Sequence, residues 1–230
     1  MRDDDGMNPP AANLDAPPPR ATSIVAVVPV FNEADRAIDV LDGLERQGIT
    51  AILVVDDGST DGSAALIDAW VAKHPAARAI HLPENEGKSA ALRAAWDILR
   101  MDLDAGRLSA DTLVVGVDGD GQHDLQYIGA LLARVEQLGV DAVIARRDLG
   151  YHGPYKRAGN ILMTAIGSVC AGRRLHDIEC GYRVDNTALV RVPSGRTRTR
   201  LSDAARHVFA MCAAAYRATL SVGCRRSMCR

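Results

Sequence analysis

The sequence predicts an α/β fold in which helices cover a mostly parallel central sheet. Short apolar, β-branched runs alternate along the chain with helical patterns, and the connections between them are short. Hydrophobic residues make up 47% of the 230 residues but aromatic residues only 4%, so the core must consist of Ala, Val, Leu and Ile. A core of this composition suits parallel strands that are buried on both faces.

The first half of the chain carries the clearest alternation. Residues 24–30 and 51–55 are continuous apolar runs, which indicates strands buried on both faces of a sheet. Between them, apolar residues recur on one helical stripe until Gly48 ends the helix. In chain order we expect a strand at Ile24–Val30, a helix at Ala34–Gln47, a strand at Ala51–Val55, a helix from a cap at Asp61 or Ser63 to Lys73, and a weak strand at Arg78–Leu82.

The alternation continues to residue 171. An Ala- and Leu-rich helix is entered through Asn85–Gly87, and Asp124 can cap the helix that follows the next apolar run. In chain order we expect a helix at Lys88–Met101, a strand at Thr112–Val117, a helix at Leu125–Leu138, a strand at Val140–Ala145 and a helix at Pro154–Ala171.

Both ends of the chain differ from this regular middle. Residues 1–22 are rich in Pro, Ala, Asn and Asp, which predicts a disordered leader. Residues 191–230 contain nine arginines and one acidic residue, Asp203. The rest of the chain is acidic, and we therefore expect no nucleic-acid partner, because phosphates require clustered Lys and Arg.

Composition also excludes membrane-spanning and disulfide-rich proteins. No apolar stretch approaches the roughly 20 residues that cross a bilayer, and the acidic N-terminus lacks the apolar region of a secretory signal. The five cysteines are an odd number and show no zinc-binding spacing. We therefore expect a cytoplasmic protein.

Acidic side chains follow three of the predicted strands, in segments 29–33, 56–63 and 118–124. Ligands of such sheets bind beyond the carboxyl ends of the strands. Carboxylates crowded there raise one another's pKa unless a cation or a hydroxyl-rich ligand offsets their charge. Oxygen ligands favour Mg²⁺ or Mn²⁺ over zinc. The sequence therefore predicts a site for a divalent cation, hydroxyl-rich ligands, or both.

Common short motifs do not explain these segments. An EF-hand loop that starts at Asp118 would need Gly and Glu where the chain has His123 and Gly129. A dinucleotide fingerprint would need Gly where the chain has Asp124. An aspartate-nucleophile phosphatase remains open, because its active site also begins with an apolar strand that ends in Asp-x-Asp.

Five motifs follow one another in a specific order over residues 24–184. They are VVPVFNE (Val27–Glu33), VVDDGSTDGS (Val54–Ser63), NEGKSAAL (Asn85–Leu92), VDGDGQHD (Val117–Asp124) and DIECGYRV (Asp177–Val184). Together they resemble GT-A glycosyltransferases of family 2, in particular the dolichol-phosphate mannosyltransferase and polyprenyl-phosphate glycosyltransferase branch. The resemblance implies a Rossmann-like, nucleotide-sugar-binding GT-A fold, with a catalytic domain at residues 23–185.

The resemblance gives segment 118–124 a role. Asp118-Gly119-Asp120 resembles the Asp-x-Asp motif of the family, so Asp118 and Gly119 would contact the nucleotide and Asp120 would hold the cation that bridges the donor's phosphates. Gln122 matches a position that completes the metal's oxygen shell in the polyprenyl-phosphate branch. A cation is needed because negative charge grows on the nucleoside diphosphate as it leaves.

Other motifs match the nucleotide cradle of the family. Pro29 and Phe31 offer faces that can stack on a base, while Glu33 and Asp57 can accept hydrogen bonds from base or ribose. Lys88 stands at the start of a helix, where its ammonium group and the free N–H groups suit a diphosphate.

Asp177 begins the segment that borders the acceptor in the family. With a sugar hydroxyl as acceptor, Asp177 would be the general base. With a lipid phosphate the nucleophile is already an anion, and Asp177 would only position groups.

The resemblance implies a metal-dependent, inverting transfer of a sugar from a GDP- or UDP-sugar donor. The acceptor would be a saccharide or, preferably, polyprenyl phosphate. The protein would then make peripheral contact with the inner face of the membrane. A phosphatase and a non-catalytic nucleotide-sugar-binding remnant remain as alternatives.

Residues 186–230 depart from the family pattern. In relatives, an acidic and apolar helix and then a strand follow the Gly-Tyr-Arg segment, whereas here Ser, Thr, Ala and Arg dominate and only Ala204–Tyr216 has a helical pattern. One explanation is a basic appendage that meets anionic lipid. We prefer another, in which the reading frame shifts near residues 185–192 and the tail is the out-of-frame translation of a GC-rich gene.

Overall fold

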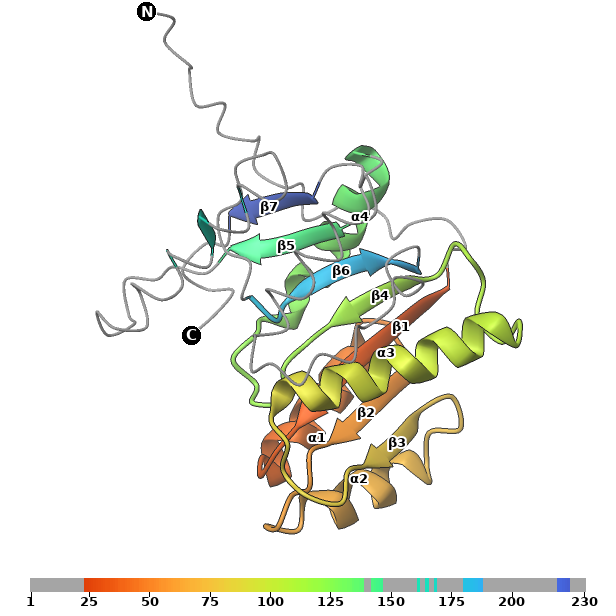
Figure 1. The fold of residues 1–230 in the computed structure, drawn as a ribbon, viewed down its shortest axis with the longest axis vertical. Helices are drawn as coiled ribbons and strands as arrows, with labels where there is room; N and C mark the ends of the chain where they lie inside the picture. The colour runs from red at the N-terminus through yellow and green to blue at the C-terminus, as the bar shows by residue number, and fades with distance from the viewer. Residues whose placement is uncertain are drawn as a thin grey trace, which may run out of the picture.

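The computed structural model describes residues 23–138, 142–146, 180–187 and 219–223, and four further helical residues between 161 and 168. The strands form one seven-stranded sheet in the order β3-β2-β1-β4-β6-β5-β7 (Figure 1). The leader predicted at 1–22, most of the tail after 185 and most of the helix predicted at 154–171 lie outside the described residues.

Strands and helices alternate as predicted as far as β5. The elements are β1 (Ile24–Val30), α1 (Ala34–Arg46), β2 (Ile52–Asp56), α2 (Ser63–Val71), β3 (Arg78–His81), α3 (Lys88–Asp104), β4 (Leu113–Gly116), the 3-10 helix η1 (Leu125–Tyr127), α4 (Ile128–Leu138), β5 (Ala142–Arg146), β6 (Arg183–Asn186) and β7 (Thr219–Gly223). The last two strands are not predicted from the sequence.

Strand β1 pairs in parallel with both β2 and β4, and β2 pairs in parallel with β3. The carboxyl ends of these four strands therefore lie at the same edge of the sheet. Strand β6 runs antiparallel to its neighbours β4 and β5, while β7 is parallel to β5. The predicted α/β fold with a mostly parallel sheet is thus confirmed.

Helices cover both faces of the sheet. Ala26, Val28 and Val30 of β1 belong to a core shared with α1, α2 and α4, whereas Val25 and Val27 pack on the face that α3 covers (Figure 1). Because alternate residues of a strand point to opposite faces, this two-sided burial explains the unbroken apolar run of β1.

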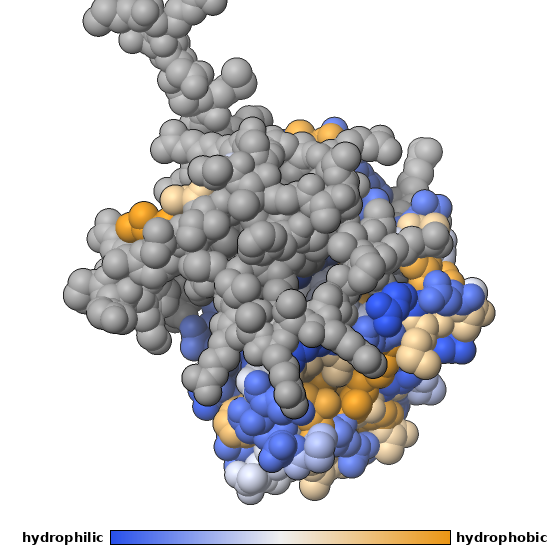
Figure 2. Space-filling view, viewed as in Figure 1, coloured by the Kyte–Doolittle hydropathy of each residue, from blue (hydrophilic) through white to orange (hydrophobic). Residues whose placement is uncertain are grey.

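The outer surface of α3 mixes polar and apolar side chains (Figure 2). Met101 on this helix is 61% exposed, for example. Among the residues that the structure describes, no helix is both long and apolar enough to cross a bilayer.

Two helix starts can be compared with their predicted caps. The N-cap position of α2 is Gly62, which has no side chain, while Asp61 accepts hydrogen bonds from the backbone N–H and the hydroxyl of Ser63. The predicted cap at Asp124 is confirmed, because its carboxylate accepts a hydrogen bond from the Gln126 N–H at the start of η1.

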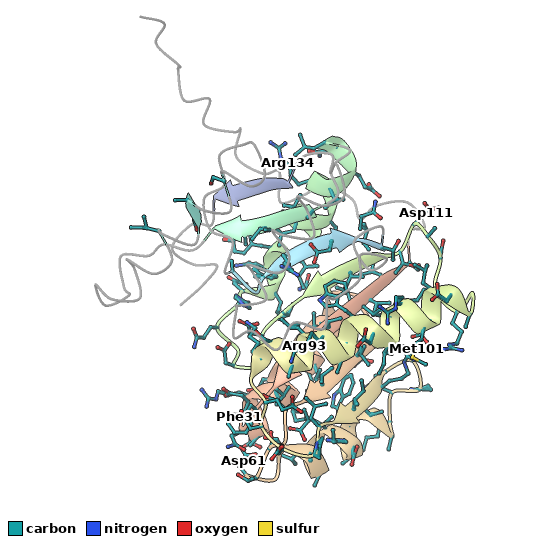
Figure 3. The ribbon with its side chains drawn as sticks, in the orientation of Figure 1. Phe31, Asp61, Arg93, Met101, Asp111 and Arg134 are labelled. Carbon is teal, nitrogen blue, oxygen red and sulfur yellow. The ribbon has the colours of Figure 1, made fainter. Side chains whose placement is uncertain are left out.

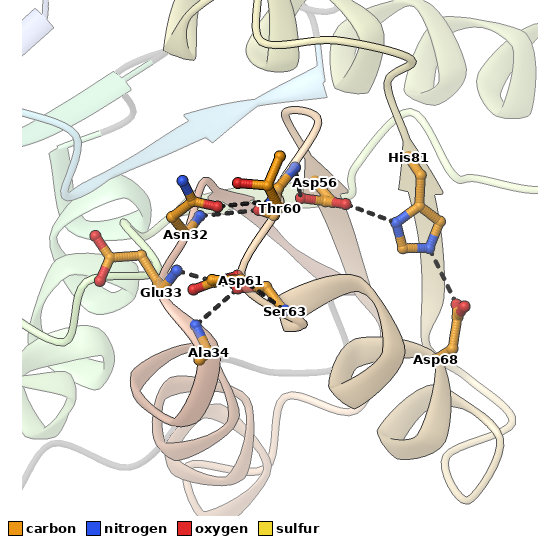
Figure 4. Close-up of polar contacts among 10 residues, drawn as sticks. Asn32, Glu33, Ala34, Asp56, Thr60, Asp61, Ser63, Asp68 and His81 are labelled. Atoms are coloured by element: carbon orange, nitrogen blue, oxygen red, sulfur yellow. Dashed lines mark hydrogen bonds and ion pairs between the residues drawn. The ribbon is translucent and has the colours of Figure 1, made fainter.

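His81, the last residue of β3, lies between two carboxylates. Its Nδ1 is 2.9 Å from Oδ2 of the buried Asp56, and its Nε2 is 3.0 Å from Oδ1 of Asp68 on α2 (Figure 4). The hydrogen bond to Asp56 is the main cause that raises the pKa of His81. Partial burial opposes this effect and Asp68 adds to it.

We predict that the contribution of His81 to stability falls as the pH rises. Its charged form is favoured in the folded state, so this contribution is full below the unfolded pKa of about 6.5 and is lost as the pH passes the raised folded pKa. His81→Gln keeps a donor for Asp56 but cannot become charged. Its melting temperature should lie below that of the wild type near pH 6 and approach it near pH 9, and a gap that stays constant with pH would contradict the prediction.

Candidate functional site

A cavity of about 420 Å³ opens at the carboxyl ends of β1, β2 and β4. The loops that follow these strands, together with the start of α3, form its walls. Figure 3 shows Phe31 and Asp61 at this end of the sheet, while Asp111, which precedes β4, lies at the opposite end. The parallel register therefore gathers segments that are far apart in the sequence around one space.

Every residue predicted to bind the nucleotide lines this cavity, and so does Asp120. These residues are Pro29, Phe31, Glu33, Asp57, Lys88, Asp118, Gly119 and Asp120. Gln122, the other predicted metal ligand, is exposed and does not line the cavity. The predicted catalytic residue Asp177 lies outside the described residues.

Four further residues line the cavity. Val30 is the last residue of β1, and Asn85, Gly87 and Ala91 belong to the NEGKSAAL motif. The motif therefore identifies the right segment of the chain. It could not show which of its side chains face the cavity, because that depends on how the helix is docked on the sheet.

Hydrogen bonds join the loop after β1 to the loop after β2 (Figure 4). The Asn32 N–H donates to Ser59 Oγ at 2.9 Å, and Asn32 Oδ1 accepts a hydrogen bond from the Thr60 N–H at 2.8 Å. Asn32 has a positive φ of 54°, a conformation that Asn tolerates better than most residues. These hydrogen bonds offset its cost and hold the neighbouring Phe31, which is 41% exposed, beside the cavity.

Ser63 forms hydrogen bonds with Glu33 and Ala34, which follow β1. Its Oγ accepts hydrogen bonds from the N–H groups of these two residues at 3.1 and 2.8 Å, and its hydroxyl donates to Asp61 at 2.5 Å. The Ser63 hydroxyl lowers the pKa of Asp61, because it stabilises the charged carboxylate. The sequence predicts Asp61 or Ser63 as the helix cap, whereas in the structure Gly62 is the N-cap, and Ser63, hydrogen-bonded to Asp61, fixes the position of Glu33.

The adjacent aspartates at the end of β2 also hold loops in place. Asp56 accepts a hydrogen bond from the Ser59 N–H at 3.0 Å, which holds the turn after β2. Asp57 is buried, and its two oxygens accept hydrogen bonds from the N–H groups of Glu86 and Gly87 at 3.1 and 2.8 Å. Asp57 therefore lines the cavity and also fixes the start of α3.

Asp118 lies between Lys88 and His123. Lys88 Nζ is 2.5 Å from one carboxylate oxygen, and His123 Nε2 is 3.3 Å from the other. Burial alone would raise the pKa of Asp118, but the His123 imidazole and the Lys88 ammonium outweigh it and hold the pKa well below its ordinary value. The carboxylate is therefore ionised at neutral pH.

Asp120 differs from Asp118 in its partners. One of its oxygens accepts a hydrogen bond from the Gln122 N–H at 3.0 Å, and no described residue forms an ion pair with it. Within the described part of the chain, no three His, Cys, Asp or Glu side chains are grouped so that they could hold a metal alone. Asp120 suits Mg²⁺ or Mn²⁺ as an oxygen ligand, provided that a bound ligand supplies further oxygens.

Three relatives each align with about 70% of this chain. The chain is 27% identical over 168 residues to an uncharacterized protein of Methanocaldococcus jannaschii, and the alignment covers 70% of each protein. It is also 27% identical to the dolichyl-phosphate beta-glucosyltransferase of Trichomonas vaginalis and to the undecaprenyl-phosphate 4-deoxy-4-formamido-L-arabinose transferase of Edwardsiella ictaluri. Those alignments cover 69% and 73% of this chain, which spans only 50% of each relative.

Among solved structures, the fold resembles a mannosyltransferase from Pyrobaculum calidifontis that was solved in complex with GDP-Man and Mn²⁺. The TM-score is 0.59, and the match covers 91% of this chain and 59% of that structure at 19% sequence identity. This likeness concerns the fold, and it confirms the predicted GT-A fold class.

The family assignment comes from the sequence match. The description of the matching family is "Glycosyl transferase family 2", and the match extends over residues 25–218, beyond residue 184 where the five motifs end. The two named relatives belong to the polyprenyl-phosphate branch that the motifs resemble. This chain is therefore a member of glycosyl transferase family 2.

Proposed function

We propose that this chain transfers one sugar from a nucleotide-sugar donor to an acceptor, in a metal-dependent reaction that inverts the configuration at the sugar's C1. The main observation behind the proposal is the cavity of about 420 Å³, which brings together the exposed ring of Phe31, the ammonium group of Lys88 and the carboxylate of Asp120. Asp120 has no ion-pair partner among the described residues. Family membership supports the class of reaction. Both GDP- and UDP-sugars remain candidate donors.

In this proposal the diphosphate of the donor lies at the start of α3. The first N–H groups of a helix are free to bind an anion. Lys88 adds a flexible ammonium group that is 47% exposed and can turn from Asp118 to a phosphate. Phe31 offers its ring to the base, and Glu33 and Asp57 accept hydrogen bonds from base or ribose.

Asp120, with Gln122, would hold the divalent cation. When bound, the cation offsets the charge that develops on the departing nucleoside diphosphate. Asp118 orients the nucleotide, and His123 stays beside its second carboxylate oxygen when Lys88 turns to a phosphate. Phosphate oxygens of the donor would supply the metal ligands that the protein lacks near Asp120.

For the acceptor we prefer polyprenyl phosphate. The relatives named above carry a dolichyl-phosphate and an undecaprenyl-phosphate acceptor in their names. An acceptor of this kind would bring the protein to the cytoplasmic face of the membrane as a peripheral protein. Membership of family 2 leaves the phosphatase alternative without support.

We predict that Asp120→Asn abolishes metal-dependent donor binding but leaves the fold intact. A ligand at 100 times its Kd stabilises a protein by about 2.7 kcal/mol, which raises the melting temperature of a chain of this size by roughly 5–10 °C. A panel of GDP, UDP and other nucleoside diphosphates, each with and without Mn²⁺, should show such a shift for the wild type and none for the variant.

The exposed Asp111 at the opposite end of the sheet provides a matched control. Asp111→Asn should keep the full Mn²⁺-dependent shift (Figure 3). Retention of the shift in Asp120→Asn would show that the metal assignment is wrong, and absence of any shift in the wild type would contradict the proposed function.

Replacement of Asp177 should discriminate between the two acceptor classes. We predict that Asp177→Asn lowers transfer to a sugar hydroxyl by about 10²–10⁴-fold, because a general base is lost. Transfer to polyprenyl phosphate should fall much less, because that nucleophile is already an anion. The measurement is the initial rate with each acceptor at a saturating donor concentration. If the rates with both acceptors fell by large and equal factors, Asp177 would instead contribute to donor binding or to the fold.

We also propose that residues after about 185 are an out-of-frame translation, although the family match continues to residue 218 and Thr219–Gly223 form a strand of the sheet. Part of the acceptor wall would then be altered and turnover would be poor. The composition of this segment supports the proposal, since nine arginines accompany three of the five cysteines. We predict that one of the other two frames of the gene encodes an acidic and apolar helix followed by an apolar strand. If neither frame does so, the basic tail is native.

A further inference from the structure

The start of β6 lies beside the Asp-x-Asp segment. In the antiparallel pairing of β4 with β6, Gly116 is opposite Arg183, so the residues that precede Arg183 continue past the carboxyl end of β4. Continuing the same register by two residues brings Gly181 next to Asp118. The family resemblance assigns the Asp177–Val184 motif to the acceptor side, but its Gly-Tyr-Arg part therefore also reaches the donor side of the sheet.

Gly181 leaves no room for a side chain. A Cβ atom at this position would lie 2.7 Å from Oδ2 and 2.8 Å from Cγ of Asp118, closer than real Cβ contacts. Gly181 has no positive φ, so its backbone does not require glycine. The requirement comes from the Asp118 carboxylate, which packs directly against the backbone of residue 181.

The next two residues of the segment contact the same site. The Tyr182 ring stacks on His123, with 4.9 Å between ring centroids, and its hydroxyl donates to the Asp124 carbonyl at 3.0 Å. His123 in turn faces Asp118 Oδ2. Arg183 Cζ lies 6.0 Å from the ring centre of Trp96 on α3, the helix that begins with Lys88. The segment thus contacts His123, one of the two partners of Asp118, as well as Asp118 itself.

We propose that Gly181 is a positioning residue of the donor site: it lets the Asp118 carboxylate lie against the start of β6, in the orientation that contacts Lys88 and His123 and that the nucleotide requires. This inference rests on the proposed function, because Asp118 is taken as a nucleotide contact. Any side chain at 181 would push the carboxylate out of this position, and the nucleotide sugar would then bind less well.

The test is a double-mutant cycle with Gly181→Ala and Asp118→Ala. In the absence of ligand, Gly181→Ala should lower the melting temperature of the wild type but not of Asp118→Ala, because the colliding carboxylate is absent there. Isothermal titration with UDP and GDP in Mn²⁺ should show at least about tenfold weaker binding for Gly181→Ala, as expected when a charged hydrogen-bond partner is misplaced. Gly129→Ala is the matched control, since a Cβ on this residue of α4 meets nothing within 4 Å.

Each outcome decides the question. An equal loss of melting temperature in both backgrounds would show that residue 181 collides with something other than Asp118. A loss confined to the wild-type background together with unchanged nucleotide affinity would show that the orientation of Asp118 does not matter for the donor. If Gly181→Ala alone fails to fold, recovery of folding in the double variant supports the contact. A wild type that binds no nucleotide at all contradicts the proposed function, and the donor role of Gly181 falls with it.

Discussion

The site depends on the parallel pairing of β1 with both β2 and β4. Strand β1 is buried on both faces and hydrogen-bonded along both edges, so that Val28 lies opposite Val54 of β2 and Ala26 lies opposite Val115 of β4. In this register the carboxyl ends of the strands reach the same edge of the sheet. The polar loops after these strands then face one another, although up to 90 residues of sequence separate them.

Most aspartates in the loops at this edge of the sheet accept hydrogen bonds from other residues of the protein and so hold the loops in place. Asp57 accepts two backbone N–H groups, Asp56 accepts one N–H and contacts His81, and Asp61 contacts Ser63. Asp120 accepts a hydrogen bond from the Gln122 N–H and forms no ion pair with any residue that the structure describes. The acidic edge is thus compatible with a diphosphate, because the charge left to balance is that of Asp120 and the ligand.

The sequence predicts the strands whose burial on both faces requires an apolar run, and it predicts the cavity because loops after parallel strands must meet. It does not predict β6, whose four residues Arg183–Asn186 look polar. In the structure Arg183 and Asp185 are both buried and pair at 2.9 Å, so a polar strand enters the sheet through an ion pair that no hydrophobic pattern reveals. Strand β7 is missed because Thr219–Gly223 contains only two large apolar residues, Leu220 and Val222, and no continuous apolar run.

Topology also changes what the Gly-Tyr-Arg segment means. By its order in the sequence it belongs after the donor motifs, on the acceptor side. Its insertion between β4 and β5 as an antiparallel strand brings its glycine against the first aspartate of the donor motif. The region β1 to β4 therefore contains the residues that we propose bind the nucleotide, but it lacks the surface against which Asp118 packs. In the proposed function, the donor site is complete only once β6 has joined the sheet, and the donor and acceptor sides share one strand.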